Sequence, residues 1–78
     1  MKNNLRSTFA IRVVAAKVAA KDIIEEGIDR YVNDGIRFGF FSVDDDPKQI
    51  ITNVIDRLIE YEEYELAGAL EKYKTLNV

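Results

Sequence analysis

The sequence predicts a mainly α-helical domain with three helices, a long N-terminal helix followed by a C-terminal helical hairpin. Two observations predict this fold. Apolar residues recur at intervals of three or four positions on both sides of the chain's midpoint, which is the spacing of a helix face. A strong helix-start signal, DDDPKQ, stands between these two parts at residues 44–49. The 78 residues fit a single domain, 1–78, and at this length folding buries only about 60% of the chain's surface.

The first predicted helix begins near Ser7 or Thr8, since either residue can serve as an N-cap. It ends before Gly35, which favours the left-handed conformation just after a helix. The residues of its apolar stripe follow one another at spacings of three or four: Phe9, Val13, Ala16, Ala20, Ile24, Gly27 and Tyr31.

The opposite side of this helix changes character along its length. Its C-terminal half is acidic, as a solvated face should be, but its N-terminal half carries Ile11, Val14 and Val18. A helix that is apolar on two sides has to be covered on both. In so short a chain the second cover is expected from another molecule, so these three residues are the first candidate protein interface, and a second copy of the chain is the expected partner.

A competing interpretation is an α+β fold with short strands at 9–14 and 36–43. FAIRVV alternates in polarity and is rich in β-branched residues, which favour strands. Its only possible pairing partner is IRFGFFSV. The phenylalanines of that second segment either fill the core or form an exposed recognition loop.

The DDDPKQ segment predicts the start of the second helix. Asp46 is the expected N-cap, Pro47 the first helical residue, and Gln49 the partner of Asp46 in a capping box. Adjacent aspartates point in different directions, so we expect capping rather than metal binding. The helix should run to about Glu60, with its core face formed by Ile50, Ile51, Val54, Ile55, Leu58 and Ile59.

The segment after Glu60 predicts a bend rather than a continuous helix. If the helix continued, its apolar stripe would reach Glu65 and Gly68, whereas the next apolar residues are rotated by roughly a quarter turn from it. A third helix would carry its acids, Glu62, Glu63 and Glu65, in its first turn, where the helix dipole favours negative charge. One continuous helix remains the alternative, because no capping residue, glycine or proline marks the bend.

The stretch LIEYEEYELAGALEKY, residues 58–73, resembles the UVR motif. This short helical hairpin occurs in the B and C subunits of bacterial excision nuclease and in certain Clp-protease adaptors. The features that carry the resemblance are the acidic turn, the Tyr64-Glu65 pair, the small pair Ala67-Gly68, and Leu70. The chain departs from the motif where that family often has an Arg-Asp pair, since it has Glu71 and Lys72 there.

The resemblance implies a docking hairpin that pairs with a like hairpin and has no catalytic residues. It makes Tyr64, Leu66 and Leu70 the second candidate interface. The small residues between them would allow a helix to approach closely, whether this belongs to a partner or is the first helix of the chain itself.

Charge is distributed unevenly along the chain. Residues 1–21 carry five basic residues and no acid, while the remainder carries six basic and fourteen acidic residues. One interpretation is that the basic arm lies against the acidic hairpin. Another is nucleic-acid binding, although a sequence pI near 4.8 opposes it. The residues that would contact phosphates are Arg6, Arg12, Lys17 and Lys21. A third interpretation is that the acidic hairpin imitates nucleic acid and occupies a basic site on another protein.

Composition excludes several classes of function. The chain has no Cys and no His, so disulfides are excluded, and zinc, haem and the commonest catalytic bases and nucleophiles are not expected. No apolar run approaches the ~20 residues of a membrane span. We therefore predict a non-enzymatic protein–protein interaction module or adaptor that self-associates, without a cofactor, a metal or a membrane partner. A cytoplasmic location is expected because the absence of Cys fits a reducing compartment.

Overall fold

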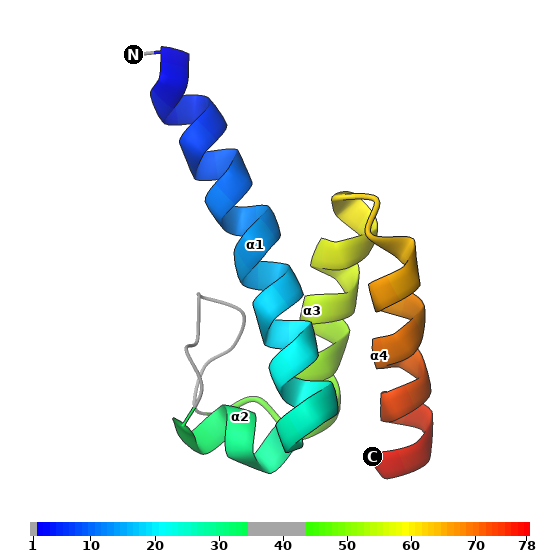
Figure 1. The fold of residues 1–78 in the computed structure, drawn as a ribbon. Helices are drawn as coiled ribbons and strands as arrows, with labels where there is room; N and C mark the ends of the chain where they lie inside the picture. Colours follow the sequence, from blue (N-terminus) through cyan, green and yellow to red (C-terminus); the bar gives the residue numbers. More distant parts are fainter. Residues whose placement is uncertain (1, 35–43) are drawn as a thin grey trace.

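Four helices make up the part of the chain that the computed structural model describes, which is residues 2–34 and 44–78, with side chains from residues 9–33 and 44–78. They pack as a small all-helical bundle in which α1, α3 and α4 lie side by side and α2 turns away at the end of α1 (Figure 1). The mainly α-helical fold is therefore confirmed. The helices are α1 (Lys2–Glu26), α2 (Ile28–Asp34), α3 (Pro47–Glu60) and α4 (Tyr64–Asn77).

The first predicted helix is two helices, so the prediction of one continuous helix is wrong, whereas α2 ends at Asp34, at the predicted position. The break lies at Gly27, whose φ of 96° is outside the helical range. Its N–H donates to the carbonyl of Ile23 at 2.9 Å, and its own carbonyl accepts from Tyr31 N–H at 3.0 Å. Gly27 thus closes one helix and opens the next. The start was also misplaced, because α1 begins at Lys2 and Ser7 and Thr8 lie inside it.

Replacing glycine with alanine should have opposite effects at two positions. At Gly27 the positive φ is strained for any L side chain, so Gly27→Ala should lower the free energy of unfolding by about 1–2 kcal/mol. Gly68 lies on the exposed side of α4, and an added Cβ would meet nothing within 4 Å. Gly68→Ala should raise the free energy of unfolding by roughly 0.5–1 kcal/mol. Urea unfolding followed by circular dichroism measures both. An increase for Gly27→Ala would contradict the left-handed conformation at Gly27, and a decrease for Gly68→Ala would contradict the open space beside Gly68.

The strand alternative fails where the structure tests it. Residues 9–14 lie within α1, so that strand does not form. Helical backbone satisfies the hydrogen-bonding groups of this segment internally, and the β-branched residues are accommodated within it. The segment 36–43, with its phenylalanines, lies outside the described residues.

At the start of α3, one of the two hydrogen bonds of the predicted capping box forms. Asp46 Oδ1 accepts from Gln49 N–H at 2.8 Å, and Pro47 is the first helical residue. In the reciprocal half of a capping box, Asp46 N–H would donate to the Gln49 side chain, and this bond does not form. Gln49 Nε2 instead donates to Asn53 Oδ1, one turn along the helix, at 2.8 Å. The N-cap is confirmed and the full capping box is wrong.

The bend between α3 and α4 is present, as the hairpin prediction required. Glu62 N–H donates to the carbonyl of Ile59 at 3.0 Å, and Glu63 N–H to that of Leu58 at 2.8 Å. This pair of bonds is the Schellman pattern, in which the residue after the helix adopts a left-handed conformation. Here that residue is Glu62, with φ 61°, rather than glycine. Glu62 and Glu63 therefore form the turn itself, and only Glu65 lies in the first turn of α4.

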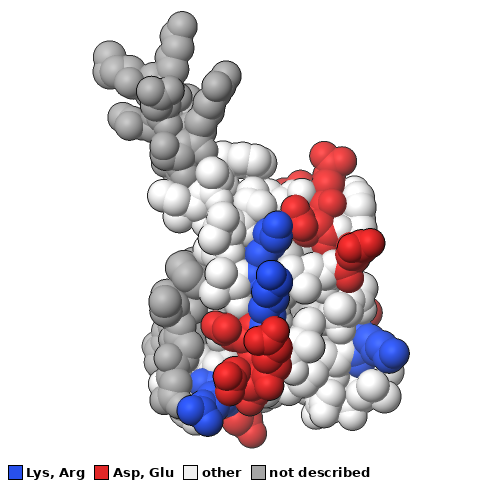
Figure 2. Space-filling view, in the orientation of Figure 1, with Lys and Arg blue, Asp and Glu red and all other residues white. Residues whose placement is uncertain are grey.

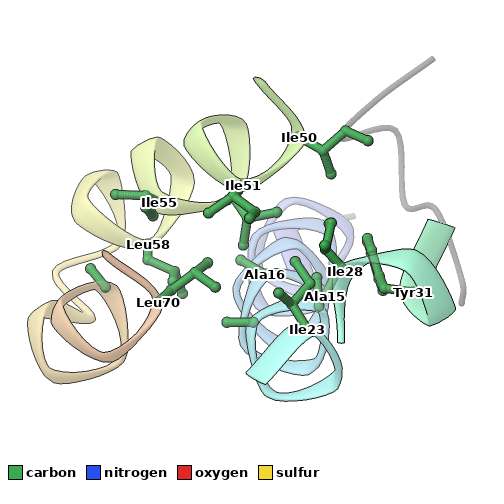
Figure 3. Close-up of a cluster of buried hydrophobic side chains, with 14 residues drawn as sticks. Ala15, Ala16, Ile23, Ile28, Tyr31, Ile50, Ile51, Ile55, Leu58 and Leu70 are labelled. Atoms are coloured by element: carbon green, nitrogen blue, oxygen red, sulfur yellow. The ribbon is translucent and has the colours of Figure 1, made fainter. Parts of the chain in front are cut away.

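The core joins small residues of α1 to large residues of the hairpin (Figure 3). Ala16 and Ala20, predicted as core, are fully buried. Phe9 and Ile59 were also predicted in core faces but are 59% and 48% exposed, so those two predictions are wrong. The buried residues are Ala15, Ala16, Ala19, Ala20, Ile23, Ile28, Tyr31, Ile50, Ile51, Val54, Ile55, Leu58, Ala67 and Leu70.

Polar contacts fasten α4 to two neighbouring helices. The Tyr73 hydroxyl accepts a hydrogen bond from Ile28 N–H at 3.0 Å, which satisfies a free backbone donor at the start of α2. Lys74 Nζ donates to Thr52 Oγ1 of α3 at 3.0 Å. In the core, burial and then the nearby Asp22 carboxylate raise the pKa of Tyr31 to about 12, so this phenol is neutral at physiological pH.

Candidate protein interface

The exposed side of α1 carries an apolar ridge, formed by Ile11, Val14 and Val18. Their exposed fractions are 64%, 57% and 36%. Spacings of three and four residues place them on one face of the helix, away from the alanines that pack on the core. The sequence predicted this second apolar side, and the structure leaves it exposed to solvent.

A shallow apolar hollow of about 250 Å³ adjoins the ridge. It lies between two rows of residues spaced by four, Ala10–Val14 and Ile11–Ala15. A groove between such rows is the feature into which a second helix packs its own row of side chains. Sequence reasoning missed Ala10 and Ala15, and the signal that marks them is the small residue beside a large one in each row.

The N-terminal turns of α1 extend past the hairpin (Figure 1). At 1.5 Å per residue, α1 is about 37 Å long, whereas α3 and α4 are each about 21 Å. The Phe9 ring packs edge-on against the Tyr61 ring, with the ring centroids 5.5 Å apart and an interplanar angle of 84°. Because Tyr61 lies at the turn between α3 and α4, Phe9 marks the level at which α1 leaves the bundle. A few helical turns without packing are marginal in water.

The second candidate interface, from the hairpin, does not form one surface. Tyr64 is 61% exposed and Leu66 is packed partly against the core, but Leu70 is completely buried. Leu70 is therefore wrong as an interface residue, because its side chain is already used inside the domain. Of the small residues around it, Ala67 is buried, whereas Gly68 and Ala69 are exposed.

The basic residues of α1 lie close to the acidic turn. Lys17 Nζ is 3.8 Å from Glu63 Oε1. Lys17 and Lys21 also line a hollow of about 360 Å³ between α1 and α4, together with two acids and two apolar residues: Glu63, Glu65, Leu66 and Ala69. On this face Lys and Arg form a short stripe with Asp and Glu at both ends (Figure 2). Of the basic residues in segment 1–21, Lys17 and Lys21 therefore lie beside acids of the hairpin.

The remaining candidates for phosphate contact add little to this arrangement. Arg12 is exposed, and the side chain of Arg6 lies outside the described residues. Among the described side chains of residues 1–21, Arg12, Lys17 and Lys21 thus offer three basic groups, of which Lys17 already has an acidic partner. Nucleic-acid affinity rises with the number of phosphates neutralised.

Among the side chains of residues 9–33 and 44–78, the structure offers no other kind of site with clear chemistry. Three or more carboxylates do not gather there in a way that would hold a metal ion. None of the described helices has the length and apolar character needed to cross a bilayer.

Comparison of the chain with protein-family models, curated proteins and solved structures finds no match. The resemblance to the UVR hairpin therefore stays a prediction. What the structure adds to it is the hairpin itself, with a tight turn between α3 and α4.

Proposed function

We propose that the chain is a non-enzymatic helical module that binds protein through the apolar ridge of α1. The observation that carries the proposal is the exposure of Ile11, Val14 and Val18 on a helix whose other side already forms the core. Single exposed apolar residues are ordinary. A continuous row of them beside an apolar hollow is typical of an interaction surface.

The chemistry of the hollow supports a protein ligand. Four of the described residues line it, all with aliphatic or methyl side chains, so none of these four offers a charge with which to orient a small polar molecule or a phosphate. The rows on either side have the spacing of a helix surface. A helical segment with its own apolar row would fit there, as in helix-in-groove recognition.

Site-specific photo-cross-linking in the cells that produce the protein tests this proposal. A photoreactive amino acid replaces Val14, on the ridge, or Asp56, an exposed residue of α3. We expect protein adducts at position 14 and none, or far fewer, at position 56. Adducts that nuclease removes would indicate nucleic acid instead. The absence of any protein adduct at position 14 would contradict the proposed function.

A further inference from the structure

We propose that the partner at the α1 ridge is a second copy of the same chain, bound with its α1 antiparallel and with the twofold axis passing near Val14. This inference rests on the proposed function, because it names the occupant of the same surface. Three features carry it: the charges of α1, the pairing of residues about Val14, and the length of α1 beyond the bundle.

The charges of α1 are arranged against its own dipole. A helix favours acids in its first turn and bases in its last turn. In α1 the first turn has no acid and the last turn has no base. The segment 2–6 instead contains two basic residues and no acid, and the segment 22–26 contains three acids and no base. In a lone helix this arrangement is unfavourable at both ends.

An antiparallel second α1 reverses that disadvantage. With the axis at Val14, each position lies opposite the one equally far beyond residue 14 on the partner. The basic segment 2–6 then lies alongside the acidic segment 22–26, twice in the dimer because the interface is self-complementary. Opposite dipole ends also become neighbours. A parallel pair would place bases beside bases and acids beside acids.

The same register gives two of the three ridge residues, Val14 and Val18, an apolar position to face, while Ile11 lies opposite Lys17. Val14 lies opposite its own copy, and Ala10 lies opposite Val18. The hollow beside Ala10 and Val14 is then the place where the partner's Val18 packs, since a large residue meets a small one. By symmetry each chain supplies one hollow and one Val18.

The projecting turns of α1 gain a cover in this arrangement. They extend beyond α3 and α4 of their own chain (Figure 1). In the antiparallel dimer they lie along the C-terminal half of the partner's α1. The part of the helix that its own bundle leaves unsupported is therefore the part that the second copy supports.

Cysteine cross-linking tests the orientation cleanly, because the chain has no cysteine of its own. A disulfide forms only where two Cα atoms come within about 7 Å. Val14→Cys alone should give a covalent dimer on mild oxidation. An equal mixture of Ala10→Cys and Val18→Cys should give the mixed disulfide as the main product. When the same mixture is oxidised in denaturant, the mixed disulfide should no longer be the main product. Asp56→Cys is the control and should stay monomeric. Homodimers of Ala10→Cys and of Val18→Cys as main products would overturn the antiparallel orientation.

Light scattering on the purified protein separates this inference from the proposed function. We expect a molar mass that rises with concentration toward twice 8.9 kDa. The dissociation constant should increase with salt, because the paired flanks carry opposite charges and salt screens their attraction; a constant that salt leaves unchanged would overturn the pairing of segments 2–6 and 22–26. A monomer at every concentration would overturn the second copy as partner. If position 14 still gave adducts with another protein in cells, the proposed function would stand, whereas a monomer with no adduct would overturn both.

Discussion

Replacing Leu70 with alanine should lower the free energy of unfolding by about 3 kcal/mol, within the range of 2–5 kcal/mol seen for buried leucines. Leu70 is completely buried, and its side chain is directed toward Leu58 between α3 and α4 (Figure 3). A domain of this size has a total stability of about 4–12 kcal/mol. The substitution would therefore remove a large share of it, and the urea midpoint should fall clearly.

Leu76→Ala is the matched control for this prediction. Leu76 lies on the same helix but is 71% exposed, so its loss should change the free energy of unfolding by no more than about 0.5 kcal/mol. Equal stability of the two variants would contradict the burial of Leu70. It would also revive the interpretation, taken from the UVR-like hairpin, that Leu70 is a docking residue.

Replacing Val14 and Val18 together with glutamate should weaken self-association by about 100-fold or more, which corresponds to about 2.7 kcal/mol. Each chain of the dimer would bring two carboxylates into an apolar contact without a partner for either, and burying an unpaired charge is strongly unfavourable. Far-UV circular dichroism should show unchanged helicity, because glutamate is a good helix former and both sites are at least one-third exposed in the single chain. Analytical ultracentrifugation measures the association.

The control for this variant changes charge equally on other helices. Ile59→Glu combined with Leu76→Glu also replaces two exposed apolar residues with acids, at positions that are 48% and 71% exposed. It should leave association within about threefold of the original, after the long-range charge effect is screened by salt. Loss of helicity in the Val14 and Val18 variant would instead mean that these residues are internal, and unchanged association would contradict the ridge as interface.

The elements that the sequence predicted correctly are those with strong local signals. Asp46 and Pro47 fix the start of α3 through one hydrogen bond and one fixed φ, both of which depend only on neighbours. The bend after Glu60 was predicted from a rotation of the apolar stripe. The residue that adopts the left-handed conformation in this bend was not predicted. It is Glu62, whereas the residue that usually indicates such a turn in a sequence is glycine.

The break at Gly27 was missed for a different reason. Gly27 falls at the correct spacing to continue the apolar stripe, so periodicity alone counts it as part of one helix. Its positive φ depends on the packing of α2 beneath the bundle, with Tyr73 of α4 bonding to Ile28. Contacts between residues so far apart in the sequence leave no local trace.

The packing of the helices on one another explains the remaining differences in the core and the site. Ala15 and Ala19 are buried where α1 packs on the rest of the domain. Because alanine is common on both buried and exposed helix faces, the sequence did not indicate that these two are buried. Leu70 and Ile59 both lie on apolar helix faces, and only the crossing of the helices decides that the first is buried and the second half exposed. The ridge was predictable because three large aliphatic residues on the second side of α1 exceed what one core can cover.

The tight turn at Glu62 and Glu63 has a consequence for the order of folding. It joins α3 and α4 through a very short connection, so their contacts are local and the loop-closure entropy of forming them is small. The contacts of α1 with this hairpin span a much longer stretch of chain and should form later. During synthesis, however, α1 leaves the ribosome before the hairpin does. For that interval both its alanine face and its aliphatic ridge are uncovered, which exposes α1 to premature association.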